Sequence, residues 1–178
     1  MKYAIYLLAI IILLGVNIGL FGNLPIRGQM PNLLLLLTVY FSVDKTNYDF
    51  FFIAFVCGLF LDCFSANFFG GWTFGFLVLA LLLHSVSSQL LVFELNWKSL
   101  ALLVLGAFTL VNFCLWLFAL AAFKFGLAPS GIGIKVLVAG FLPGLFYNLL
   151  LLYPMYVVFD RLKSLIADFS VRSRGIVR

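Results

Sequence analysis

The chain has 178 residues, of which 65% are hydrophobic and 10% are charged, and its formal net charge is +5. Soluble domains carry about 25% charged residues, and one small core cannot hide this much apolar surface, so the composition excludes a soluble globular domain. The positive charge does not indicate a nucleic-acid-binding protein, because the basic residues lie at the edges of apolar runs and form no stripe with aromatic residues between them.

Six apolar segments follow one another along the chain. They cover residues 3–22, 30–43, 48–65, 70–91, 98–123 and 135–159. A membrane-spanning helix needs about 20 mainly apolar residues. The runs are continuously apolar, whereas strands of a membrane barrel alternate apolar with polar residues. The sequence therefore predicts an all-α integral membrane protein, a compact bundle of about six transmembrane helices that forms one domain over residues 1–160.

The first two segments differ in length. The first follows Lys2, is long for a signal peptide and is followed by no A-x-A cleavage site, so we expect it to be retained as a transmembrane helix. The second, "MPNLLLLLTVYFSV", is short. Its residues 30–43 rise about 21 Å as a helix, against a hydrocarbon core of about 30 Å. This segment must thin the bilayer, include preceding residues or lie inside the bundle.

The last segment and the tail raise two questions. Pro143 and Pro154 lie inside the sixth segment and predict kinks, because proline removes a backbone donor and clashes with the preceding turn. Residues 161–178 form a short basic tail in which apolar residues recur at helical spacing. The tail fits a helix lying on the cytoplasmic leaflet, and it equally fits an extension of the sixth helix.

The lysines and arginines predict the orientation. With six spans, both termini lie on the same side of the membrane. That side carries eight of the eleven basic residues, and the other side carries Arg27, Lys124 and Lys135. Because cytoplasmic loops are enriched in lysine and arginine, both termini are predicted to be cytoplasmic.

Small residues indicate where helices approach one another. Glycines recur four residues apart at Gly15/Gly19, Gly71/Gly75 and Gly140/Gly144. In lipid, such pairs let two helix backbones come close. Each pair marks either a crossing inside the bundle or a groove for a foreign helix.

The polar residues inside the spans are few. They are Asn17, Asp62, His84, Gln89, Asn112 and Asn148. We expect Asn112 and Asn148 to form hydrogen bonds across the bundle.

Asp62 is the carboxylate placed deepest in an apolar run. It shares a helix face with Gly58, four residues earlier, and a lipid-facing charge costs about 3 kcal/mol, so we expect Asp62 to face protein. Its candidate partners are Arg27, Lys135 and the backbone amides at the start of the fourth helix, around Gly70 and Gly71, since a helix N-terminus favours an anion.

Catalysis is not predicted. The intramembrane inventory offers one carboxylate, Asp62, and one histidine, His84, on different helices and toward opposite sides of the membrane. GxSxG, HExxH and P-loop motifs are absent. The sequence predicts a non-enzymatic protein without a cofactor or metal.

The region 30–84 resembles the rod shape-determining protein MreD family. That family shows a Pro-Asn/Asp pair before a leucine run, then a G-L-x-x-D element, and then a glycine that starts the next helix. The corresponding residues are Pro31 and Asn32, then Gly58, Leu59 and Asp62, then Gly70 or Gly71. The chain length, the six predicted spans and the short loops also match.

The resemblance implies a function and partners. It implies a non-enzymatic subunit of the bacterial cell elongation machinery in the cytoplasmic membrane. It further implies binding to MreC and an indirect association with MreB and the peptidoglycan synthases of the lateral wall. Family members are likened in fold to the substrate-capturing subunits of energy-coupling-factor transporters. The candidate structural or partner-binding residues are Pro31, Asn32, Gly58, Asp62, Gly70, Gly71, Gly75, Gly140 and Gly144.

An alternative function is small-molecule capture. The kinked sixth helix and the sparse polar interior are compatible with a substrate-capturing subunit of a vitamin transporter. This alternative predicts a polar pocket that opens to the outside. The predicted outer loops offer few polar residues for such a pocket, which argues against it.

Overall fold

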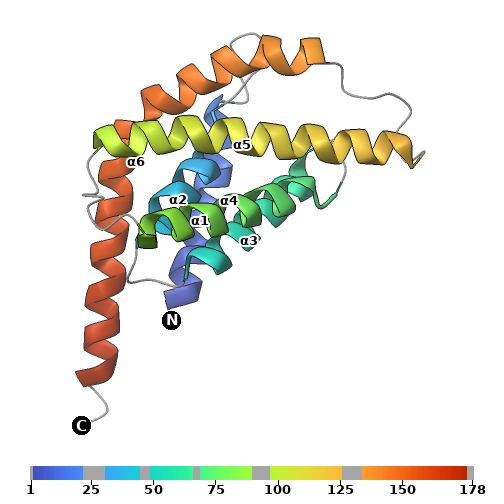
Figure 1. Ribbon diagram of the computed structural model, residues 1–178. Helices are drawn as coiled ribbons and strands as arrows, with labels where there is room; N and C mark the ends of the chain where they lie inside the picture. Colours follow the sequence, from blue (N-terminus) through green and yellow to red (C-terminus); the bar gives the residue numbers. More distant parts are fainter. Residues whose placement is uncertain are drawn as a thin grey trace.

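The protein is all-helical over the residues that its computed structural model describes. These are residues 2–21, 31–44, 49–65, 69–89, 97–125 and 134–175. They form α1 (Lys2–Phe21), α2 (Leu33–Ser42), α3 (Phe50–Phe64), α4 (Gly71–Gln89), α5 (Trp97–Lys124) and α6 (Ile134–Gly175), as Figure 1 shows. The predicted helical class is confirmed for this part of the chain.

The short helix α2 is the centre of the molecule. All of its residues are buried, and it contacts each of the other five helices. A helix of this length rises about 15 Å, half the thickness of a hydrocarbon core. A helix that is apolar on every face is typical of a protein core or of a membrane span, and in this structure the other helices cover α2. Of the three possibilities for residues 30–43, the structure has the one inside the bundle.

In the described part of the chain, three helices are long and apolar enough to cross a membrane. They are α1, α5 and α6, and less than a third of the most apolar stretch of each is buried inside the protein. Large apolar side chains are exposed along all three helices. A water-soluble monomer rarely exposes so much apolar surface, whereas a bilayer accommodates it. The apolar helices α2, α3 and α4 are shorter.

The two ends of the chain lie at the same end of the molecule (Figure 1). Lys2 Nζ lies 2.8 Å from Asp49 Oδ1, just before α3. Lys163 Nζ lies 2.7 Å from Asp44 Oδ2, just after α2. Asp44 and Asp49 lie between α2 and α3. Through these two ion pairs, the start of α1 and the C-terminal part of α6 both contact this part of the chain.

Helix α6 is one continuous helix up to Gly175, with Pro143 and Pro154 inside it. It changes direction between its orange N-terminal part and its red C-terminal part in Figure 1. Loss of the proline N–H and the clash of the ring with the preceding turn favour such a bend. Of the two possibilities for the tail, the structure has the extension of the sixth helix, through residues 161–175.

Candidate functional site

Asp62 caps the N-terminus of the neighbouring helix α4. Its side chain is buried, Oδ1 accepts a hydrogen bond from the Trp72 N–H at 2.9 Å, and Oδ2 accepts one from the Thr73 N–H at 2.9 Å. The Thr73 hydroxyl also donates to Oδ2, at 2.5 Å. The first amides of a helix lack intrahelical partners and carry partial positive charge, so they stabilise an anion. We call this arrangement the Asp62 cap.

The Asp62 cap tests the predicted partners. The prediction of backbone amides at the start of the fourth helix is confirmed, and the amides are those of Trp72 and Thr73. Arg27 and the side chain of Lys135 lie outside the described residues. The predicted orientation of Asp62 toward protein is confirmed by its 3% exposure.

Gly58 allows α4 to start directly against α3. A Cβ added at Gly58 would lie 2.5 Å from Thr73 Cα and 3.1 Å from the Trp72 carbonyl oxygen. Both distances are to backbone atoms, which cannot move aside as a side chain can. The expectation of a close approach at Gly58 is confirmed. Gly70, in the turn before α4, has a φ of 98°, a backbone conformation that favours glycine.

The glycine pairs of α4 and α6 pack inside the bundle. A Cβ at Gly71 or Gly75 would make ordinary contacts with side chains of α5. Gly140 is buried, and a Cβ at Gly144 would lie 2.8 Å from the ring of Phe108 on α5. Of these glycines, Gly144 is the one at which a Cβ would clash, so it limits how closely α6 packs against α5.

The glycine pair of α1 is different. Gly15 and Gly19 are exposed, and a Cβ at either would meet no atom of the described residues within 4 Å. The glycines of the other two predicted pairs are buried.

Asn32 joins the start of α2 to α6. Its Oδ1 accepts a hydrogen bond from the Leu35 N–H at 3.0 Å, which caps α2. Its own N–H donates to Asn148 Oδ1 at 3.0 Å, and Asn148 Nδ2 donates to the Gly144 carbonyl at 2.7 Å. The expected cross-bundle hydrogen bond of Asn148 is confirmed. Asn112 instead donates to the Phe108 carbonyl of its own helix, at 2.7 Å.

His84 lies far from the Asp62 cap, as expected. Its ring stacks on Phe50, with the ring centroids 4.2 Å apart. His84 lies eleven residues after Thr73 in α4, which corresponds to about 16 Å along the helix axis. Among the described residues, no group of three histidine, cysteine, aspartate or glutamate side chains is placed to hold a metal ion.

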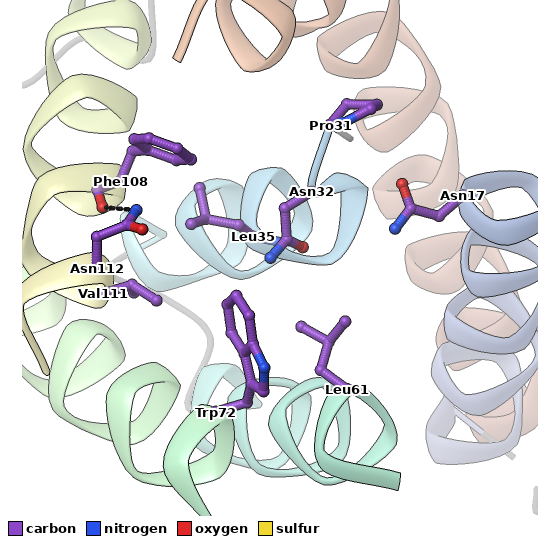
Figure 2. Close-up of a pocket in the computed structure, with 9 residues that line it drawn as sticks. All are labelled: Asn17, Pro31, Asn32, Leu35, Leu61, Trp72, Phe108, Val111 and Asn112. Atoms are coloured by element: carbon purple, nitrogen blue, oxygen red, sulfur yellow. Dashed lines mark hydrogen bonds between the residues drawn. The ribbon is translucent and has the colours of Figure 1, made fainter. Parts of the chain in front are cut away.

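A cavity of about 210 Å³ lies between the first five helices (Figure 2). It is lined by Asn17, Pro31, Asn32, Leu35, Leu61, Trp72, Phe108, Val111 and Asn112. Among the described residues, the lining contains amide, aromatic and aliphatic side chains and no charged one. Asn17 and Asn112 were expected only as separate polar residues inside the spans. Together with Asn32 and Trp72 they come from α1, the N-cap of α2, α4 and α5, and no local spacing in the sequence connects them.

Comparison of the chain with protein-family models, with curated proteins and with solved structures gave no match. The resemblance over residues 30–84 therefore stays a prediction.

Proposed function

We propose that this chain is a non-enzymatic subunit of the bacterial cell elongation machinery, similar to MreD, that binds the transmembrane helix of MreC. It lies in the cytoplasmic membrane as a bundle of six helices that resembles the substrate-capturing subunits of energy-coupling-factor transporters. Through MreC it is associated with MreB and the peptidoglycan synthases, and it helps to maintain cell shape.

The pairing of the two chain ends supports the proposed orientation. Lys2 and Lys163 both pair with aspartates near the passage from α2 to α3, so the start of α1 and the end of α6 lie on one side. The two ends of a chain lie on the same side of the membrane when the chain crosses it an even number of times. The basic residues on that side favour the cytoplasm.

The outward face of α1 is the observation that carries the proposal. We define this face by Leu8, Ile11, Ile12, Gly15 and Gly19, which recur at helical spacing and are exposed. Nothing among the described residues lies within 4 Å of a Cβ built at either glycine. Close helix association in lipid needs small residues that let backbones approach, and this face presents two of them one turn apart. It suits a single apolar helix of a partner.

Co-purification from native membranes tests the proposal. We expect MreC to be recovered with the wild-type chain and to be lost with Gly15→Leu, because a leucine keeps a foreign backbone away. Gly106→Leu on α5 is the matched control, since a Cβ at Gly106 also meets nothing within 4 Å. Equal recovery with both variants would contradict a binding role of α1. Rod-shaped cells after depletion, together with absence of MreC from the purified material, would refute the function.

A second candidate function, small-molecule capture, is favoured by one observation. The cavity between α1, α2, α3, α4 and α5 has the amide-lined character that this function requires. Its lining includes Asn32, just before α2, and Trp72, at the start of α4, whereas Lys2 and Lys163 pair with Asp49 and Asp44, which lie between the end of α2 and the start of α3. In the proposed orientation the cavity therefore lies toward the outer end.

A further inference from the structure

Two buried polar atoms lack hydrogen-bond partners beside the cavity. Asn17 is 8% exposed, and its Oδ1 has no partner. The indole Nε1 of Trp72 is also buried and has none. Both residues line the cavity, and Figure 2 shows their side chains directed into it from α1 and α4. A buried polar group without a partner costs about 1–3 kcal/mol, so these two atoms favour an occupant that can bond to them.

The two unpaired atoms require opposite partners. The indole N–H is a donor only, so it needs an acceptor on the occupant, whereas the Asn17 oxygen needs a donor. Asn112 uses its Nδ2 on the Phe108 carbonyl and presents its oxygen toward the same space in Figure 2. The occupant must therefore carry acceptors and donors on different edges.

The size and charge of the cavity limit the occupant further. An engineered cavity of about 150 Å³ holds benzene, so one of about 210 Å³ holds a ring with a small substituent. Among the described residues, the lining offers no charged side chain to balance an ion, so it favours a neutral occupant. The indole of Trp72 and the ring of Phe108 offer faces for stacking on a flat molecule.

We infer that this cavity is a binding site for a small, neutral, flat heterocycle that carries both a hydrogen-bond donor and an acceptor, such as a pyridine carboxamide. Asn17 Oδ1 accepts from the ligand's N–H, and Trp72 Nε1 donates to its carbonyl or ring nitrogen. This inference names the ligand class for the second candidate function. It is independent of MreC binding, because the outward face of α1 and the cavity use different residues.

Equilibrium dialysis of labelled nicotinamide against the full chain in nanodiscs tests the site. We expect saturable binding with a Kd in the micromolar to millimolar range. Nicotinate, which has the same ring and a negative charge, and toluene, which lacks hydrogen-bonding groups, should compete at least about tenfold more weakly, since each loses at least one bond to a buried polar group. Absence of saturable nicotinamide binding, as for a cavity that holds water alone, would overturn the inference.

Variants connect the binding to the two unpaired atoms. Asn17→Leu and Trp72→Phe should each weaken nicotinamide binding about tenfold or more. Trp72→Phe keeps the backbone N–H that donates a hydrogen bond to Asp62, so this variant tests the site even if Asn17→Leu fails to fold. The matched controls are Thr109→Val and Trp116→Phe, which do not line the cavity and should bind as the wild type does. Unchanged binding in both cavity variants would overturn the inference. Loss of nicotinamide binding with MreC recovery intact would separate the failure of this site from the failure of the scaffold proposal.

Discussion

The two ends of the molecule hold buried carboxylates in different ways. At one end, Asp62 accepts hydrogen bonds from backbone amides that lie ten and eleven residues later in the chain. At the other end, Asp49 and Asp44 pair with the side chains of Lys2 and Lys163, which come from the first and last helices.

The difference is one of rigidity. The two amides that donate to Asp62 are fixed by helix α4, so these donors lose no side-chain freedom when they bond. The lysine side chains are 45% and 41% exposed, which lets water and ions compete with the aspartates. We therefore expect the Asp62 end to contribute more to stability than the end that holds the two lysine pairs.

Replacing Asp62 has the largest expected effect. Asp62→Ala removes three hydrogen bonds and leaves two amides and a hydroxyl without their acceptor, so it should lower the free energy of unfolding by about 3 kcal/mol or more. Asp62→Asn keeps an acceptor oxygen and should cost less. Unfolding in mixed micelles measures both. The control is Asp160→Ala. The Asp160 carboxylate is exposed and accepts a hydrogen bond from the Tyr40 hydroxyl at 3.3 Å. Equal costs at both positions would show that the buried Asp62 cap contributes no more to stability than an exposed carboxylate does.

Replacing Gly58 tests the same end through packing. Gly58→Ala places a Cβ 2.5 Å from Thr73 Cα, so α4 must move away from α3, at a cost of about 1–3 kcal/mol. Gly75→Ala is the matched control on α4, because its Cβ would lie 3.7 Å from the nearest atoms. The same micelle assay should rank Gly58→Ala well below Gly75→Ala in stability. The reverse order would show that α4 does not depend on the close approach.

The pair of Lys2 and Asp49 should contribute less. Lys2 Nζ donates to both carboxylate oxygens, at 2.8 and 3.0 Å, and the Tyr6 hydroxyl donates to Asp49 at 3.3 Å. A double-mutant cycle with Lys2→Met and Asp49→Asn should give a coupling energy of about 1 kcal/mol, the upper range for exposed pairs. A coupling as large as the cost of Asp62→Ala would reverse the comparison of the two ends.

The sequence predicted the Asp62 end and missed the other. Gly58, Asp62 and the start of α4 are close along the chain, so helical spacing and the charge of a helix terminus are enough to name the α4 amides as one of three candidate partners, and the structure has that one. The ion pairs of Lys2 and Lys163 depend on which helices become neighbours in the fold. In the sequence, these two lysines indicated the orientation in the membrane and nothing about their partners. The cavity was missed for the same reason, since its amide and indole groups meet through the packing of four helices around α2. For α2 itself, composition left three possibilities, and burial on every face decided among them.

The pair of Lys163 and Asp44 should have the smallest effect and the strongest dependence on salt. Lys163 makes one contact, at 2.7 Å, from a side chain that is 41% exposed. Raising the ionic strength from about 0.01 M to about 1 M shortens the screening length from about 30 Å to about 3 Å, so salt should remove most of a contribution below about 1 kcal/mol. A double-mutant cycle with Lys163→Gln and Asp44→Asn, measured at both salt concentrations, isolates this pair from the rest of the chain. The cost of Asp62→Ala, measured at the same two concentrations, should stay nearly constant, because Asp62 is buried and its partners carry no net charge. If salt weakens both ends equally, exposure of the lysines is not what distinguishes them.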